Sequence, residues 1–213
     1  MQSFSPDQAA AAPAVVPVPP AIAAGKGALE PLTTLTTEFP GLVVIEPRVF
    51  EDARGFFMET YHRERFALAG LPTSFAQDNH SLSRRNVIRG LHYQIERPQG
   101  KMVRAVRGTV FDVVVDLRRG SASFGRWLGM ELCAGGVCQL YVPGGFAHGF
   151  LVMSETALFS YKCTDYYAPG HEQSVRWNDP DLGVRWPTEA PLLSSKDAAA
   201  PLLSDVAPER MFG

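Results

Sequence analysis

The sequence lacks the features that mark several large classes of protein. It has only three cysteines in 213 residues, none in a Cys-x-x-Cys pair, so neither a disulfide framework nor a cysteine zinc site is expected. Lys and Arg total 20 against 22 for Asp and Glu, so there is no excess positive charge for nucleic acid. No apolar run reaches the roughly 18 residues of a membrane-spanning helix. The first lysine is Lys26, so no secretory signal is predicted either, and the expected location is cytoplasmic.

Several cofactor and catalytic motifs are also missing. There is no Gly-x-Gly-x-x-Gly, no phosphate-binding P-loop and no serine nucleophile elbow. Folds that bind nicotinamide cofactors or nucleoside triphosphates therefore have no support, and no cofactor is predicted.

The first 30 residues are rich in alanine and proline, with nine Ala, five Pro and Phe4 as the one aromatic residue. Such a segment cannot bury enough apolar surface to offset its loss of chain entropy. We predict a flexible extension over residues 1–32 and one domain over residues 33–213. A targeting or docking arm is the alternative.

From Gly41 onward, short alternating runs are separated by turn residues, which indicates an all-β antiparallel sandwich or barrel. One helix is expected over residues 63–71. Trp127–Cys133 is expected to pair with Val137–Val142 across a Gly-Gly turn, which would place Cys133 opposite Cys138. Reduced thiols are expected there, and a disulfide is the alternative. Around ten short strands favour a double-sheet jelly-roll barrel with one or a few short helices.

Polar residues interrupt three of these strand-like runs, at residues 86–94, 98–104 and 142–150. Strict alternation would put Arg89 and His92 on opposite faces of one strand, unless Gly90 carries a bulge. Charges that face the interior of a small barrel are costly unless they meet a ligand. His92, Lys101, His148 and the two arginines Arg54 and Arg89 therefore indicate a site, and the arginines suggest a phosphate. A hydrogen-bonded core histidine and a surface Arg54 remain alternatives.

The segment from about Phe39 to Leu203 resembles the dTDP-4-dehydrorhamnose 3,5-epimerase family, which consists of metal-independent cupin barrels acting on dTDP-linked 4-keto sugars. The matching motifs are Asp52–Phe57, Gln77–Ser81, Arg89–Gln94, Gln99–Lys101, Pro143–Phe150, Trp177–Pro180 and Leu193–Asp197. One departure is Asn86, where the family often has glycine. The resemblance implies a cupin-type jelly roll and an isomerase of a dTDP-4-keto-6-deoxyhexose in dTDP-rhamnose biosynthesis.

The resemblance also implies a role for each matching residue. His92 is the base and Asp197 orients it, Lys101 stabilises the enolate oxygen, and Tyr161 returns the proton from the opposite face. Arg54 and Arg89 hold the diphosphate, and Tyr167 stacks on thymine. The nucleotide end and further ligand contacts fall to Glu59, Gln77, Asp78, Asn79, His148, Glu172 and Lys196. The family is dimeric, so a homodimer is implied.

Three alternatives stay open. A single-centre epimerase shares all of these motifs, and the double epimerase is favoured only because it is the commoner activity. A non-catalytic sugar-nucleotide binding module would keep the arginines but lose the base or acid. A metal-dependent cupin oxygenase would need a carboxylate spaced with the histidines, and His92 and His148 show none in the sequence. No metal is therefore predicted.

Overall fold

The computed structural model describes residues 30–134, 136 and 138–213. The predicted extension over residues 1–32 lies almost wholly outside this range, and the first described strand begins at Thr33. The elements are β1 (Thr33–Thr36), β2 (Val43–Glu46), β3 (Val49–Asp52), β4 (Gly55–Met58), α1 (Arg63–Leu68), β5 (Gln77–Arg84), β6 (Ile88–Gln94), β7 (Lys101–Arg107), β8 (Thr109–Asp116), β9 (Trp127–Cys133), β10 (Gln139–Val142), β11 (Phe146–Val152), β12 (Thr156–Cys163), β13 (Glu172–Ser174) and α2 (Ser195–Ala198).

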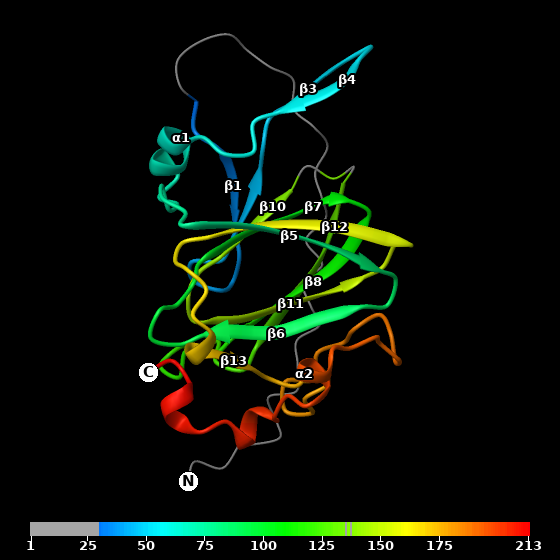
Figure 1. Ribbon diagram of the computed structural model, residues 1–213. Helices are drawn as coiled ribbons and strands as arrows, with labels where there is room; N and C mark the ends of the chain where they lie inside the picture. The colour runs from blue at the N-terminus through cyan, green and yellow to red at the C-terminus, as the bar shows by residue number, and fades with distance from the viewer. Residues whose placement is uncertain (1–29, 135, 137) are drawn as a thin grey trace.

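Two antiparallel sheets face each other and form the body of the barrel (Figure 1). One has six strands in the order β1-β2-β10-β7-β12-β5, and the other has five in the order β13-β6-β11-β8-β9. Buried apolar side chains from both sheets, such as Val103, Val114, Leu140 and Phe159, fill the space between them. The predicted all-β, double-sheet jelly roll is confirmed. The β3–β4 hairpin forms a separate two-stranded sheet that projects away from the body (Figure 1).

The alternation of side chains along each strand determines which residues face the barrel interior. On β8, Val110 and Val114 belong to the core between the sheets, whereas Val113 and Val115 pack on the outer face. Asp112 has the same parity as Val110 and Val114, so this carboxylate points inward. By the same argument, residues 146, 148, 150 and 152 of β11 and residues 157, 159, 161 and 163 of β12 share the interior.

A bulge interrupts this alternation in β6. His148 of β11 pairs with His92, but Phe150 pairs with Arg89, so an advance of two residues along β11 corresponds to three residues along β6. The extra residue resets the alternation, because one additional residue shifts every later side chain to the other face. Arg89 and His92 therefore both face the interior, which decides the question that the sequence left open.

The predicted pairing of residues 127–133 with residues 137–142 is wrong. β9 is an edge strand of the five-stranded sheet and pairs with β8, whereas β10 lies in the six-stranded sheet between β2 and β7. The Gly-Gly segment thus connects the two sheets instead of closing a hairpin; its residues 135 and 137 lie outside the described range. Cys133 and Cys138 are free thiols, as is Cys163.

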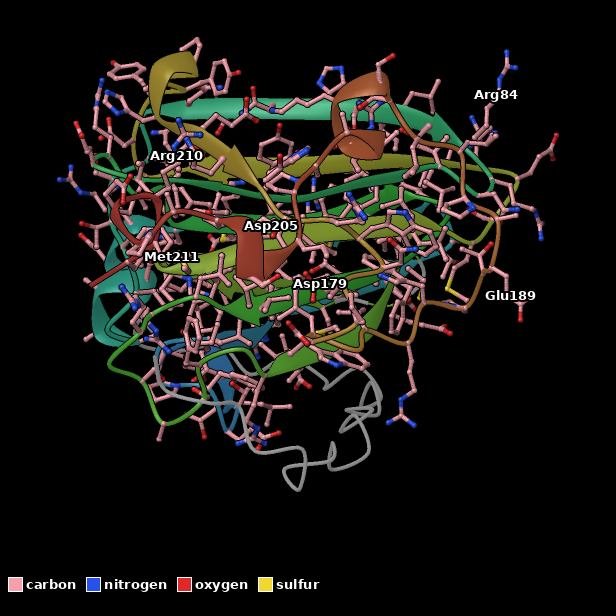
Figure 2. All side chains as sticks on the ribbon, turned by 90° about the horizontal axis from the view of Figure 1, so that it is seen from below. Arg84, Asp179, Glu189, Asp205, Arg210 and Met211 are labelled. Atoms are coloured by element: carbon pink, nitrogen blue, oxygen red, sulfur yellow. The ribbon has the colours of Figure 1, made fainter. Side chains whose placement is uncertain are left out.

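The C-terminal segment covers the outer face of the five-stranded sheet, as Figure 2 shows from below. Leu182, Trp186 and Leu203 pack against Leu91 and Val113 of that sheet. This packing brings α2 to the edge of β6 and so places residues 194–197 beside the barrel interior. The first helix is shorter than predicted and ends at Leu68. Within the described residues, no helix has the length and apolar character that crossing a bilayer requires.

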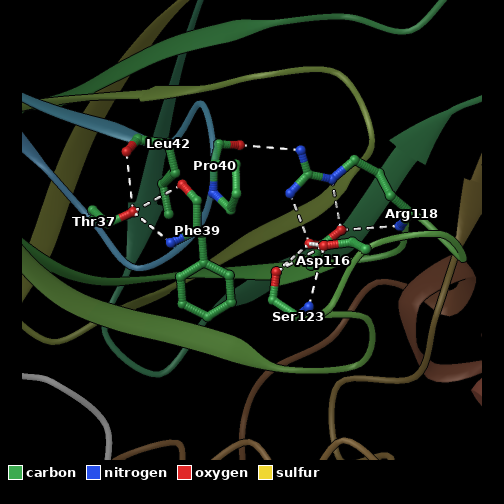
Figure 3. Close-up of polar contacts among 8 residues, drawn as sticks. Thr37, Phe39, Pro40, Leu42, Asp116, Arg118 and Ser123 are labelled. Atoms are coloured by element: carbon green, nitrogen blue, oxygen red, sulfur yellow. Dashed lines mark hydrogen bonds and ion pairs between the residues drawn. The ribbon is translucent and has the colours of Figure 1, made fainter.

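A buried carboxylate fixes the connection between β8 and β9 (Figure 3). Asp116 accepts hydrogen bonds from the Arg118 guanidinium at 2.7 and 2.8 Å and from the hydroxyls of Ser121 and Ser123, both at 2.7 Å. Burial alone would raise the pKa of this carboxyl, but these donors outweigh it and hold the pKa at about 2. Arg118 also lies 4.4 Å from the ring centroid of Phe146, which anchors the start of β11.

Candidate active site

The interior of the barrel opens into a cavity of about 460 Å³, which we call the main cavity. Polar side chains from both sheets and from α2 face it, and one wall is apolar. Its lining residues are Ser81, Val87, Ile88, Arg89, His92, Lys101, His148, Phe150, Phe159, Tyr161, Leu192, Leu193, Ser194, Lys196 and Asp197. Five of the predicted site residues on strands and two on α2 therefore meet in one place.

His92 and Asp197 form a hydrogen-bonded pair on one side of the main cavity. The Nε2 atom of His92 lies 2.5 Å from Asp197 Oδ1, and Ser194 donates a hydrogen bond to the other carboxylate oxygen at 2.8 Å. Burial tends to raise the pKa of Asp197, but the hydrogen bonds from His92 and Ser194 outweigh it and lower the pKa. An ionised carboxylate on Nε2 leaves the opposite ring nitrogen as the unprotonated one, which suits a general base.

Tyr161 faces the main cavity from the opposite sheet, on β12. Burial raises the pKa of its phenol, so the proton is held at neutral pH. A protonated phenol and an imidazole base thus reach one cavity from two sheets that face each other. This arrangement places a proton donor and a proton acceptor on opposite sides of the main cavity.

Lys101 is the first residue of β7 and lies inside the barrel. It is paired with Cys163 of β12, and Tyr161 is two residues before Cys163 on the same face of that strand, so Lys101 lies close to Tyr161. Burial lowers the pKa of its ammonium, and the nearby Cys163, Glu172 and Asp112 partly offset that effect. Within the described residues the ammonium makes no hydrogen bond or ion pair. It is therefore available to an anionic oxygen in the cavity.

His148 and Asp112 form a second pair that sequence reasoning missed. His148 Nε2 lies 2.9 and 3.1 Å from the two oxygens of Asp112, and both residues are buried. Asp112 is the single charged residue inside the Val-rich core of β8, and that break in an apolar run is a signal that could have found it. The sequence predicted Asp197 as the partner of His92 but gave no partner for His148, since spacing along the chain does not show pairing across strands.

The carboxylates of Asp197 and Asp112 do not make a metal centre. Each hydrogen bonds to the Nε2 atom of its own histidine. Across the part of the chain that the structure describes, no three His, Cys, Asp or Glu side chains gather as a metal site requires.

A smaller cavity of about 290 Å³ adjoins the main cavity and shares His92, Lys101 and Tyr161 with it. Gln77, Asn79, Tyr167 and Glu172 line it. Gln77 donates to Asn79 at 2.9 Å and accepts a hydrogen bond from the backbone N–H of Tyr167 at 2.8 Å. We call it the polar cavity.

Glu172 joins the two cavities electrostatically. Its Oε2 atom accepts a hydrogen bond from Tyr167 at 2.6 Å and lies 2.5 Å from the ammonium of Lys196. Burial raises the pKa of Glu172, but Lys196 and Tyr167 outweigh it and lower the pKa. Lys196 is thereby held at the rim of the main cavity, next to Asp197.

Three predicted ligand contacts are not brought to either cavity. Asp78 alternates with Gln77 and Asn79, so its side chain points away from the interior and pairs with Lys162 at 2.8 Å. Glu59 lies 3.5 Å from Arg65 of α1. Arg54 sits in the turn of the β3–β4 hairpin, where its side chain is 90% exposed and pairs with Asp52. Arg89, in contrast, lines the main cavity, held by a 3.0 Å hydrogen bond to Ser83.

An imidazole–carboxylate base, a buried ammonium and a phenol around one cavity define an enzyme of the general acid–base class, built on a cupin-type barrel. The family model for dTDP-4-dehydrorhamnose 3,5-epimerase matches residues 36–205. The chain belongs to this family.

Relatives and solved structures agree with that assignment. The dTDP-4-dehydrorhamnose 3,5-epimerase of Pseudomonas aeruginosa is 56% identical over 168 residues, which cover 78% of this chain and 93% of the relative. The dTDP-4-dehydrorhamnose 3-epimerase of Streptomyces niveus is 44% identical over 167 residues, covering 78% and 81%. The crystal structure of dTDP-6-deoxy-D-glucose-3,5-epimerase from Legionella pneumophila, in complex with dTDP-4-keto-L-rhamnose, superposes with a TM-score of 0.82 at 46% identity, covering 85% of this chain and 97% of that one.

Proposed function

We propose that this protein epimerises C3 and C5 of dTDP-4-dehydro-6-deoxyglucose, giving dTDP-4-dehydrorhamnose, for dTDP-rhamnose biosynthesis. The observation that carries the proposal is the placement of His92 with Asp197 on one side of the main cavity and of Tyr161 on the other. Inversion of a carbon centre needs removal of a proton from one face and delivery of a proton to the other.

The acidity of the substrate explains the need for Lys101. A proton on C3 or C5 is acidic because the neighbouring C4 ketone takes up the negative charge as an enolate. His92 removes the proton while Asp197 stabilises the imidazolium that forms. The Lys101 ammonium, with no competing protein partner among the described residues, stabilises the enolate oxygen.

Tyr161 completes the inversion from the opposite sheet. Its phenol delivers a proton to the enolate carbon, and the C4 carbonyl reforms. Net proton count is unchanged, since the base has gained one proton and the acid has lost one; exchange with solvent restores both groups. The same two side chains act on C3 and on C5 in turn.

The remaining residues are proposed to hold the nucleotide. Arg89 at the wall of the main cavity binds the diphosphate through charge-assisted hydrogen bonds. The polar cavity takes the nucleoside, with Gln77 and Asn79 as hydrogen-bonding groups and Tyr167 as the stacking ring. The Legionella structure, which holds dTDP-4-keto-L-rhamnose, supports a dTDP-sugar as the ligand.

Arg54 is proposed to act from a second copy of the chain, in a homodimer. The β3–β4 hairpin that carries it exposes Phe50, Phe56 and Phe57 by 44, 61 and 68%. Exposed aromatic rings on a projecting hairpin are typical of a surface that another chain covers. Arg54 of the partner subunit would then reach the diphosphate that Arg89 binds.

Mixing two inactive variants tests this dimer. Arg54→Ala and His92→Ala should each be nearly inactive alone. If Arg54 acts across the interface, their mixed dimers hold one intact site, so subunit exchange should restore about a quarter of wild-type activity. A dimer in which no activity returns would place Arg54 on its own subunit's site or outside it.

Deuterium incorporation tests the reaction itself. The protein is incubated with dTDP-4-keto-6-deoxyglucose in deuterium oxide, and C3 and C5 are followed by NMR. Deuterium and inverted configuration at both carbons are expected. The Streptomyces niveus relative favours the second candidate, a single-centre epimerase, which would invert one carbon only. The absence of exchange at both carbons would remove the proposed reaction. Location in the cytoplasm stays a prediction.

A further inference from the structure

The C-terminal residues beyond the family match close a third cavity next to Lys101. The family model ends at residue 205, whereas the chain continues to Gly213. The third cavity, which we call the rear cavity, has a volume of about 10 Å³. Its lining residues are Tyr93, Gln94, Gln99, Lys101, Val142, Gly144, Gly145, Phe146, His148 and Phe212.

The rear cavity shares Lys101 and His148 with the main cavity, and it shares Tyr93, Gln94, Gln99 and Lys101 with the polar cavity. Lys101 and His148 therefore form the wall between the site of chemistry and the rear cavity. The amide groups of Gln94 and Gln99 are occupied, since both donate to backbone carbonyls and Gln94 also accepts from Ala168. The Lys101 ammonium is the charged group in the lining, and water that entered here would solvate it.

Phe212 reaches the rear cavity from the C-terminal tail, and the tail is held firmly. Tyr93 donates a hydrogen bond to the backbone carbonyl of Arg210 at 3.0 Å, and the ring of Phe212 lies 5.7 Å from that of Tyr93. The backbone N–H of Arg119 donates to the carbonyl of Phe212 at 3.1 Å. Figure 2 shows Arg210 and Met211 along the same face of the barrel.

The size of the rear cavity makes this cover decisive. A cavity needs roughly 10–15 Å³ to hold one water molecule, so the space is at the limit for a single water. The Phe212 ring in the lining occupies space that water would otherwise fill. On this side Lys101 then meets protein instead of water. Once substrate fills the main and polar cavities, the charge of Lys101 acts more strongly on a nearby oxyanion than it would in water.

We propose that Phe212 is a positioning residue for the epimerisation, which fills the rear cavity and keeps water from the Lys101 ammonium on that side. The proposal rests on the proposed role of Lys101. Removal of the ring should admit water, stabilise the charged form of Lys101 in the free enzyme and weaken its hold on the enolate.

The charged and titratable groups that surround Lys101 stay in place when Phe212 is changed. Burial is the largest influence on the Lys101 pKa and lowers it. A change at Phe212 alters only the hydration of the Lys101 ammonium. The groups that face Lys101 are Cys163, Glu172, Asp112 and Lys196, together with the cavity residues His92, His148, Tyr93 and Tyr161.

The test titrates Lys101 directly. The chain has four lysines, at positions 26, 101, 162 and 196, so NMR of protein labelled at the lysine Cε carbons gives few signals, and Lys101→Arg assigns the one needed. In Phe212→Ala the Lys101 midpoint should rise by at least about half a pH unit, towards the ordinary lysine value. Turnover should fall, by less than the roughly 100-fold loss that removal of a whole donor causes.

Two matched variants separate sealing from general packing. Met211→Ala removes a neighbouring side chain that packs on the same outer core but does not line the rear cavity, and Phe212→Leu keeps an apolar cover. Both should leave the Lys101 midpoint unchanged. Phe212→Val, a smaller change of the same kind, should give a smaller rise and serves if the alanine variant melts below the assay temperature.

An unchanged Lys101 midpoint in a folded Phe212→Ala protein would overturn the proposal, and so would an equal rise in Met211→Ala. The titration is made without substrate, so its result does not depend on which reaction the enzyme catalyses. Loss of epimerisation in the wild-type protein would instead count against the proposed function.

Discussion

Replacement of Tyr161 by phenylalanine separates the two halves of the inversion. The change removes one oxygen atom from a half-buried ring that lines the main and polar cavities. The hydroxyl donates no hydrogen bond to any described residue, and the remaining ring keeps its contact with Phe159, 6.4 Å away. The fold should therefore lose less than about 1 kcal/mol of stability, and the His92–Asp197 pair is untouched.

The expected loss of inversion follows from the state of the phenol. An ordinary tyrosine, with a pKa near 10, is only about 0.1% ionised at pH 7, and burial raises the pKa of Tyr161 above that value. Nearly every enzyme molecule therefore carries the proton to be delivered. Loss of a general acid lowers a rate by about 10²- to 10⁴-fold, so inversion should fall within that range.

Proton removal should survive the same change. His92 can still form the enolate and can return a deuteron to the face from which it took the proton. In deuterium oxide, NMR should therefore show deuterium at C3 or C5 with retained configuration, at a rate above that of inversion. His92→Ala should abolish exchange and inversion together.

Tyr166→Phe is the matched control, because Tyr166 is 59% exposed and lines none of the three cavities. It should behave as the wild type. A Tyr161→Phe enzyme that inverts its substrate at the parental rate would show that another donor, such as a bound water, is the acid. Equal loss of exchange and inversion would show that Tyr161 also supports proton removal.

Three further predictions concern metal dependence, dTDP binding and the stability that Asp116 contributes. Dialysis against a strong chelator should leave turnover intact, because the described residues hold no cluster of metal ligands; loss of activity that a divalent ion restores would refute this. Arg89→Ala should weaken dTDP binding about 10- to 100-fold by calorimetry, with the exposed Arg84→Ala as control; equal affinity would remove Arg89 from the site. Asp116→Asn should lower the free energy of unfolding by about 2.5 kcal/mol near pH 7, since the pKa of Asp116 is about 2 in the folded protein and 3.8 in the unfolded chain. This contribution is complete above about pH 4 and disappears as the pH falls towards 2. Urea unfolding between pH 6 and pH 2 should therefore show the difference in stability between the variant and the wild type shrink as the pH falls.

Much of the barrel could be predicted because its strands carry period-two patterns bounded by glycine and proline. The strand expected over residues 127–133 is β9, and the one expected over residues 137–142 differs from β10 by two residues at its start. The inward orientation of Lys101 was expected from those patterns, and the cavity lining confirms it. Pairing between strands could not be read in the same way, since β9 and β10 look like a hairpin locally and yet belong to different sheets. Which sheet a strand joins depends on contacts far apart in the chain.

The site shows the same division between local and distant information. His92 and Lys101 stand in recognisable motifs, whereas Asp112 has none, and its partner His148 is 36 residues away. Arg54 lies in a motif as well, but the motif does not show whether the hairpin packs on its own subunit or projects away from it. The structure leaves it exposed, so the motif predicted a role without predicting its place.

The bulge at Gly90 shows how one local irregularity decides the chemistry. Gly90 has φ +127°, and a Cβ atom there would lie 2.5 Å from Gly149 Cα on the neighbouring strand. A Cβ on Gly149 would in turn lie 2.8 Å from the carbonyl oxygen of Arg89. Glycine at both positions therefore permits the close approach of β6 and β11 that accommodates the extra residue. Without that residue, regular alternation would turn either Arg89 or His92 out of the barrel, and the proposed diphosphate contact and the proposed base could not serve the same substrate.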